Sequence, residues 1–285
     1  MATLVASWEE YARGTEGASV RRLPGVTAAV FARGPERAVY NNSVLEWAEA
    51  IDAMEAAYAE AGVGRFAAWV HEGDSILRAA IERRGYTVVE ATRAMGTALD
   101  TALPPRGEAE VSRAGWAEYL RIADLPAGLM TGVDPDAFHV VVGRLDGEVV
   151  AAGISYDHDG DCGIYNVVTR EHARRRGVGT AVTAALVRAA RERGCATASL
   201  QSTPIAERVY AAVGFRDLGR ILEYAPAPRF PRRGGVGRED GDPLATPDEQ
   251  TSEVVGRSPE PDGMGGRPPA RGERRASRKT PDADE

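Results

Sequence analysis

Cysteine is almost absent from this chain, which contains only Cys162 and Cys195. Two thiols cannot build the disulfide framework of a small secreted scaffold, and neither has the CxxC or histidine spacing of a zinc site. Each opens an expected strand. We therefore expect two small buried side chains without a redox role, and no bound metal.

Long apolar runs are also missing, because no stretch reaches the roughly 20 residues that a helix needs to cross a bilayer. The N-terminus carries Glu9 and Glu10 where a secretory signal would be basic. We expect no membrane partner and a cytoplasmic location. With 43% apolar residues, the chain still has enough material for two cores of ordinary size.

Lysine occurs once, at Lys279, so arginine carries nearly all the positive charge of a chain whose formal net charge is −7. This acidity argues against nonspecific binding to nucleic acid, which depends on neutralising phosphates with basic residues. The arginine bias accompanies abundant alanine and glycine, as is typical of a GC-rich coding sequence. We therefore do not interpret it as arginine-based recognition, and we expect no nucleic-acid partner.

Residues 228–285 nearly lack aromatic side chains, with Phe230 as the exception, and contain nine of the 17 prolines. Such a segment cannot bury enough apolar area to offset the entropy lost on ordering. We predict a disordered tail. Its mixed charge leaves two interpretations open, an interaction arm or a tolerated extension.

A second break falls at residues 103–107, where two consecutive prolines interrupt both strand pairing and helix continuation. It separates a first region, residues 1–103, from a second, residues 107–227. Both regions are expected to contain helix, strand, helix and strand in that order. The expected elements are residues 46–62, 66–70, 75–84 and 86–89 in the first region and 178–193, 196–201, 204–213 and 215–224 in the second. This parallel suggests an internal repeat.

The second region begins with two apolar strand patterns, residues 137–144 and 148–156, around Asp146-Gly147. Asp-Gly between apolar runs is a strong hairpin signal. A polar turn over residues 157–161 then leads into a strand over residues 163–169. The pattern predicts an antiparallel meander.

The meander runs into Arg174-Arg175-Arg176-Gly177-Val178-Gly179-Thr180, and an amphipathic helix begins at Val178. Glycines stand where side chains would block a phosphate, and the first helical turn leaves backbone N–H groups unpaired. Short Gly/Arg patterns are weak evidence alone, but a position between strand and helix strengthens this one. We predict a pyrophosphate site there.

Residues 137–224 resemble the acetyl-CoA-binding core of the GNAT superfamily of N-acetyltransferases. The resemblance rests on three segments in chain order, which are Val167-Val168-Thr169, Arg174-x-x-Gly177-x-Gly179 and Ala206-x-x-Val209-Tyr210-x-x-x-Gly214-Phe215. It implies an α/β (α+β) fold, with a mixed, mostly antiparallel sheet flanked by helices. It also implies acetyl-CoA as co-substrate.

The resemblance further implies which residues hold acetyl-CoA. They are Val167, Val168 and Thr169 through their main chain, and Arg174, Arg175, Arg176, Gly177, Val178, Gly179 and Thr180 around the pyrophosphate. A strand splayed from its neighbour could pair with the pantetheine amides, and the N–H of Val168 is the candidate to polarise the thioester carbonyl. Thr203 stands where family members often carry a CoA-binding asparagine, for which it is a shorter polar substitute.

Tyr210 matches the tyrosine that protonates the departing thiolate in the family, so the resemblance makes it the candidate general acid. The other interpretation is an aromatic residue packed on the sheet. The general base stays open, because the strand over residues 163–169 contains no carboxylate. The alternatives are a water chain, Glu223, or a residue of the preceding turn, namely Asp157, His158, Asp159 or Asp161.

The first region lacks both chemical features of the second. No Arg-x-x-Gly-x-Gly follows residues 39–44, and Ile81 stands where the alignment would put the acid. We therefore expect a tandem arrangement, with a degenerate N-terminal GNAT-like half that shapes an acceptor pocket and a competent C-terminal half.

The leading hypothesis is an enzyme that transfers the acetyl group of acetyl-CoA to a primary amine by direct attack in a ternary complex. The acceptor would be an amine on a small molecule or a peptide. The alternative is a non-catalytic acyl-CoA-binding regulatory module. The glycine loop fits both hypotheses, but Tyr210 has no purpose in a sensor. Oligomeric state and acyl-chain preference leave no mark in the sequence.

Overall fold

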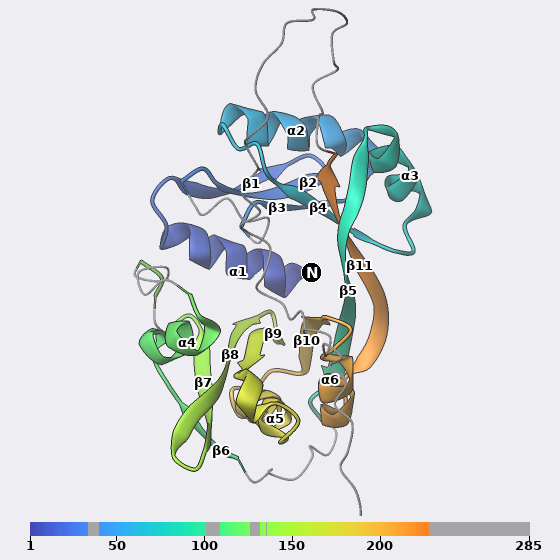
Figure 1. Cartoon of the computed structure of the whole chain (residues 1–285). Helices are drawn as coiled ribbons and strands as arrows, with labels where there is room; N and C mark the ends of the chain where they lie inside the picture. The colour runs from blue at the N-terminus through green and yellow to red at the C-terminus, as the bar shows by residue number, and fades with distance from the viewer. Residues whose placement is uncertain (34–39, 101–108, 126–131, 135, 228–285) are drawn as a thin grey trace, which may run out of the picture. The chain divides into compact units, whose positions relative to one another are not determined.

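A computed structural model of the chain describes residues 1–33, 40–100, 109–125, 132–134 and 136–227. The strands of this part form a single sheet, in the order β1-β2-β3-β4-β11-β5-β10-β9-β8-β7-β6 (Figure 1). The predicted break at residues 103–107 and the predicted tail at residues 228–285 lie outside the described residues.

The strands are β1 Ala18–Leu23, β2 Val26–Phe31, β3 Asn42–Leu45, β4 Ala67–His71, β5 Tyr86–Ala98, β6 Glu110–Arg113, β7 His139–Leu145, β8 Glu148–His158, β9 Asp161–Thr169, β10 Thr197–Ser202 and β11 Arg216–Pro226. The α-helices are α1 Ala2–Arg13, α2 Ile51–Glu60, α3 Ser75–Arg83, α4 Trp116–Ala123, α5 Val178–Glu192 and α6 Glu207–Val213, with short 3₁₀ turns at Ala48–Ala50 and Glu171–Ala173. Of the strand pairs, only β3 with β4 and β9 with β10 are parallel. The expected mixed, mostly antiparallel sheet flanked by helices is confirmed.

Several expected boundaries are wrong, and three of them bear on the site described below. The strand expected over residues 86–89 continues to Ala98, because β10 and β11 pair with its later residues. The turn expected over residues 157–161 shrinks to Asp159-Gly160, both at positive φ, since Asp157 and His158 end β8 and Asp161 begins β9.

The third wrong boundary is the start of α6. The helix expected over residues 204–213 begins at Glu207, with Ala206 as its N-cap. The main chain turns once before the helix, and Thr203 accepts the Ala206 N–H through its carbonyl at 3.0 Å. Thr203 therefore closes a turn instead of capping the helix.

The two halves share the middle of the sheet through their last strands. β5, which closes the first half, lies between β10 and β11 of the second. β11, which closes the second half, lies between β4 and β5 of the first. Each half therefore completes the sheet of the other, an exchange that the order of elements along the chain does not reveal.

Separate clusters of buried side chains cover the sheet. α5 and α6 pack with β8, β9 and β10 around one cluster, while α2 and α3 pack with β2 and β4 around another. α4 lies over β7 and β8. α1 contacts strands of both halves, because Trp8 packs edge-on against Trp69 of β4 at 5.9 Å and Thr3 donates to Asp161 of β9 at 2.6 Å.

The position of α5 depends on two glycines in the strands beneath it. A Cβ atom at Gly143 would lie 2.8 Å from Val178, and one at Gly153 would lie 3.0 Å from Val182. Larger residues at these points would push the helix away from β7 and β8. The two glycines thus allow α5 to pack closely, which fixes where its first turn lies.

Candidate functional site

The first feature of the site is a gap in the pairing between β9 and β10. Their parallel ladder ends at Leu200 and Ile164, after which β9 stays paired with β8 alone and β10 with β5 alone. A register shift in the β8–β9 ladder and a positive φ of 49° at Asn166 mark the place where β9 bends away. The described residues therefore place no strand against this edge of β9 at Val167 to Thr169.

The direction of the backbone groups at that edge follows from the register. Arg170 donates its N–H to Val150 at 2.8 Å, and hydrogen-bonded antiparallel pairs recur at every second residue. The N–H of Val168 therefore faces β8, since Val168 pairs with Ala152 in the same register. The groups that face the open edge are those of Val167 and Thr169, so the register favours Val167 over Val168 as the donor to a thioester carbonyl.

The second feature is the turn into α5. Arg175 and Gly177 both have positive φ, 61° and 77°, and Gly177 is the N-cap of the helix. In the described part of the chain, the N–H groups of residues 175–180 donate no hydrogen bond. Successive free N–H groups at a helix start form a concave site for an anion, and an arginine held at positive φ is a strained conformation often found at binding sites.

The two features lie next to each other. A Cβ atom at Gly179 would lie 3.4 Å from the Thr169 hydroxyl oxygen, so the first turn of α5 touches the end of β9. Arg174 also donates through Nε to the carbonyl of Thr169 at 3.3 Å. The open edge of β9 and the free amides of α5 thus lie next to each other, although the Thr169 carbonyl itself is bound by Arg174.

The three arginines of the loop have different surroundings. Arg174 is bound to the main chain of β9, whereas Arg176 lies 3.7 Å from Asp146 across the surface. Arg175 is exposed and has no hydrogen-bond or ion-pair partner among the residues described. Arg175 is therefore the arginine whose guanidinium is available to a phosphate.

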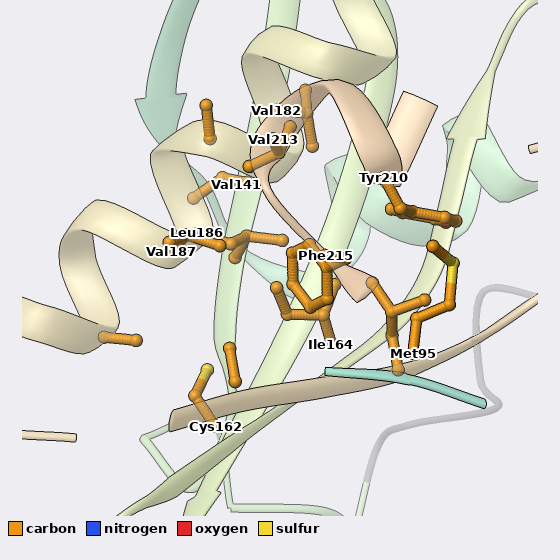
Figure 2. Close-up of a cluster of buried hydrophobic side chains, with 14 of the residues drawn as sticks. Met95, Val141, Cys162, Ile164, Val182, Leu186, Val187, Tyr210, Val213 and Phe215 are labelled. Atoms are coloured by element: carbon orange, nitrogen blue, oxygen red, sulfur yellow. The ribbon is translucent and has the colours of Figure 1, made fainter. Parts of the chain in front are cut away.

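Tyr210 lies on α6 within the core cluster that also contains Met95, Val213 and Phe215 (Figure 2). Its ring meets that of Phe215 edge-on, with centroids 6.1 Å apart. The hydroxyl group makes no hydrogen bond to any described residue. Burial raises the pKa of Tyr210 to about 12, so the phenol stays protonated at neutral pH and can act as a proton donor.

Thr203 follows β10 and is half-buried. Its carbonyl accepts hydrogen bonds from the Ala206 N–H at 3.0 Å and from the Ser202 hydroxyl at 2.8 Å. The Thr203 hydroxyl has no partner among the described residues and is free to bind a ligand.

Two of the carboxylates considered as general bases have structural partners. Arg193 binds Asp157 through two hydrogen bonds, at 2.6 and 2.9 Å. Burial alone would raise the pKa of Asp157, but the hydrogen bonds from Arg193 and His139 outweigh it and hold that pKa well below its ordinary value. Asp161 accepts from Thr3, Thr197 and Ser199 hydroxyls at 2.6 to 2.7 Å. Both groups join elements of the fold.

Glu223 has a different environment. It lies in β11, opposite Trp69 of β4 on one side and Glu90 of β5 on the other, and neither glutamate has a cationic partner among the described residues. Burial and the neighbouring charge of Glu90 raise the pKa of Glu223 to about 7, with the Trp69 side chain partly offsetting them. Of the candidates, it is the carboxylate best matched to taking a proton near neutral pH.

Both cysteines are buried, as expected. Burial raises the pKa of Cys162 well above that of a free thiol and the pKa of Cys195 to about 11, so neither is a reactive thiolate at neutral pH. The described residues contain no group of three or more His, Cys, Asp or Glu side chains that could hold a metal. No helix among them is long and apolar enough to cross a membrane.

The sequence interpretation missed the contribution of β5 to this site. Met95 of β5 packs in the cluster that surrounds Tyr210, and Thr92 donates to the Gln201 side chain at 2.9 Å. Arg93 forms ion pairs with Glu207 of α6 and Asp217 of β11. The sequence does carry a signal for this strand, because residues 91–98 include β-branched and apolar residues without the apolar repeat of an amphipathic helix. That signal does not reveal which strands pair with it.

Comparison with known proteins gives the following matches. Residues 100–215 match the family model of the Acetyltransferase (GNAT) family. No curated protein matches the chain significantly.

Several solved structures share the fold. A GCN5-related N-acetyltransferase from Kribbella flavida aligns with a TM-score of 0.62 at 18% identity, over 80% of this chain and 96% of that one. A GCN5-related N-acetyltransferase from Sphaerobacter thermophilus aligns with a TM-score of 0.52 at 17% identity, over 70% and 76%. A tandem GNAT protein from the clavulanic acid biosynthesis pathway aligns with a TM-score of 0.51 at 12% identity, over 78% and 94%. At these identities the likeness extends to the fold, and the last match agrees with a tandem arrangement.

Proposed function

Since residues 100–215 match the model of the Acetyltransferase (GNAT) family, we propose that the chain is an N-acetyltransferase that uses acetyl-CoA. The observation that carries the proposal is that the open edge of β9 lies next to the unpaired N–H groups at the first turn of α5. Unpaired backbone groups are costly unless solvent or a ligand satisfies them.

The chemistry of acetyl-CoA fits the donors and acceptors of the β9 edge and the α5 turn. The backbone of Val167 and Thr169 can pair with the pantetheine amides as an added strand would. The N–H groups of residues 175–180, together with Arg175, can hold the pyrophosphate at the helix start. Thr203, at the end of β10, offers a further hydroxyl on the other side of the opening.

Acetyl transfer needs three things of the protein, which are a donor to the thioester carbonyl, an acid for the departing thiolate and a route for the proton of the amine. The N–H of Val167 supplies the first, and the protonated phenol of Tyr210 supplies the second. The amine attacks the thioester carbon directly, its C–N bond forms as the C–S bond breaks, and the sulfur takes a proton from Tyr210. Buried, protonated Cys162 and Cys195 give no support to a covalent acyl-enzyme.

The acceptor is a primary amine on a small molecule or a peptide. Glu223 is the carboxylate that the electrostatics favour for taking its proton, because it is only partly ionised at neutral pH and has no competing cation among the described residues. A water chain would lead from the amine to this group if the two are not in contact.

A thiol-release assay with acetyl-CoA and a panel of small-molecule and peptide amines tests the proposal. We expect amine-dependent release of free thiol and an acetylated amine detectable by mass. Tight acetyl-CoA binding in a thermal-shift experiment without turnover on any amine would instead favour the acyl-CoA-binding regulatory module. Absence of both binding and turnover would contradict each hypothesis.

A further inference from the structure

Arg93 joins elements of both halves of the chain. It lies on β5 of the first half, directly opposite Ser202 of β10 and Arg220 of β11 in the sheet. Its Nε atom lies 2.9 Å from a Glu207 carboxylate oxygen, and its Nη1 atom pairs with Asp217. The Arg93 side chain is only 19% exposed, so solvent screens these pairs less than it screens the ion pairs of the open surface.

The helix that receives this contact is poorly stabilised by its own sequence. α6 spans only Glu207–Val213, and its N-cap residue Ala206 has no side chain that could accept an N–H. A helix of two turns is not stable in water without tertiary contacts. Its C-terminal end is fixed by the left-handed Gly214 and by the Phe215 N–H, which donates to the Tyr210 carbonyl at 3.1 Å.

The contact at Glu207 lies one helical turn from Tyr210. Residues three apart lie on neighbouring positions of a helix surface, so fixing Glu207 limits how far α6 can rotate or slide. Met95, two residues after Arg93 on the same strand, belongs to the cluster that surrounds the Tyr210 ring. β5 therefore contacts α6 both at its start and at the tyrosine.

We propose that Arg93 is a positioning residue for acetyl transfer. The N-terminal half supplies this residue to the C-terminal half, and Arg93 holds Tyr210 in place through Glu207. This inference rests on the proposed function, since it gives Tyr210 the role of the acid. It assigns the degenerate half a direct part in the reaction beyond packing and shaping a pocket.

The two acidic partners of Arg93 provide a matched test. Glu207→Gln and Asp217→Asn each remove one carboxylate from the same guanidinium, but only Glu207 belongs to α6. We expect Glu207→Gln and Arg93→Met to lower kcat by about tenfold, since small displacements of a reacting group cost factors of this order or more. The KM for acetyl-CoA should stay within about twofold, because both changes lie outside the pyrophosphate site. Asp217→Asn should leave kcat within about twofold while lowering the melting temperature.

A double-mutant cycle separates positioning from general destabilisation. If Arg93 acts through Tyr210, then Arg93→Met should change kcat less than about twofold in a Tyr210→Phe background. Equal losses from Glu207→Gln and Asp217→Asn, or a full tenfold loss in the Tyr210→Phe background, would overturn the proposal.

Hydrogen exchange keeps this proposal distinct from the proposed function. The backbone amides of residues 210–214 should exchange faster in Arg93→Met and Glu207→Gln than in the wild-type chain or in Asp217→Asn. Unchanged exchange in all variants would show that Arg93 does not hold α6. The exchange result could also show that Arg93 holds α6 through Glu207 while the wild-type protein releases no thiol with any amine. That outcome would contradict the acetyl-transfer function, and with it the proposed part of Arg93 in the reaction.

Discussion

Burial raises the pKa of both Tyr210 and Glu223, with different consequences for what each can do. A tyrosine is already protonated at neutral pH, and a pKa of about 12 means that the phenol keeps its proton until negative charge develops on a nearby atom, such as the sulfur of a departing thiolate. A glutamate with a pKa of about 7 changes from an ordinary anion into a group that exchanges its proton at neutral pH. The electrostatics therefore suit Tyr210 to giving a proton and Glu223 to taking one.

Replacing Tyr210 by phenylalanine should lower kcat by about 100-fold, since a positioned general acid contributes factors of this size. Stability should change little, because the lost hydroxyl makes no hydrogen bond to a described residue. Steady-state kinetics and thermal melting measure both. Tyr224→Phe is the control, since its hydroxyl donates to Glu82 at 2.6 Å and its loss should reduce stability without changing kcat. Normal turnover by Tyr210→Phe would remove the acid role.

Replacing Glu223 by glutamine should change how stability depends on pH. Between its ordinary pKa near 4.5 and its folded pKa of about 7, the wild-type carboxyl is ionised in the unfolded chain but protonated in the folded one. Stability from this group is therefore complete below pH 4.5 and falls as the pH rises to 7. Glu223→Gln should remove that fall, as urea titrations at pH 5 and pH 8 would show. Glu110→Gln, on exposed β6, should follow the wild-type slope.

At the scale of elements, the site is made of places where regular structure stops. β9 and β10 stop pairing after Ile164 and Leu200, and α5 has an N-cap residue without a side chain to bind its free N–H groups. Elsewhere each of these groups would have a backbone or capping partner. A ligand that carries amides followed by phosphates would complement these two places, because its amides can pair with the open edge of β9 and its phosphates with the free N–H groups of α5.

Gly177→Ala tests the helix start, with Gly160→Ala as a matched control. Both glycines have nearly the same positive φ, 77° and 76°, and neither has an atom within 4 Å of an added Cβ. Each substitution should destabilise the fold by about 1 kcal/mol through backbone strain. Only Gly177→Ala should raise the KM for acetyl-CoA, by about tenfold, because Gly160 lies in the turn at the opposite end of β9. A similar KM for both variants would argue against a pyrophosphate at α5.

At the scale of the described molecule, the two halves cannot be separated along the chain without breaking the sheet. Removing residues 1–103 would take away β5, which pairs with both β10 and β11, and β4, which pairs with β11. Tyr210 would also lose Met95 from its core cluster. The second half is therefore incomplete as a continuous segment.

Residues 107–227 produced alone should aggregate or show no cooperative melting transition, because the exposed edge of β10 would have no partner. Production together with residues 1–103 should restore a folded complex and any acetyl-transfer activity. Size-exclusion chromatography, melting curves and the thiol-release assay provide the measurements. A folded, active fragment of residues 107–227 would show that β5 is dispensable.

The sequence predicted local features well, wherever the responsible residues lie close together in the chain. The Asp146-Gly147 turn joins β7 and β8 as predicted, and both of its residues have positive φ. The turn into α5 was also recognisable, because a few neighbouring residues determine its geometry. The roles of Tyr210 and of the loop residues stay predictions.

Features that depend on contacts between distant residues were less predictable. Asp157 looked like part of a polar turn, whereas the structure pairs it with Arg193, whose sequence position gives no hint of the contact. Glu223 looked like any glutamate in a strand, until Trp69 and Glu90 of the other half were placed beside it. A pKa depends on burial and on neighbouring charges, and the residues adjacent in sequence determine neither of them.

The sequence by itself determined many of the elements and the resemblance of the second half to the GNAT family, because backbone preferences and short motifs act over a few residues. Only the tertiary structure decided that β5 and β11 change places between the halves and that Arg93 reaches the helix carrying Tyr210. Strand pairing joins residues more than 100 positions apart, such as Ser202 of β10 and Arg93 of β5, and many pairings satisfy the same local pattern. The choice among them is made by the packing of the whole sheet.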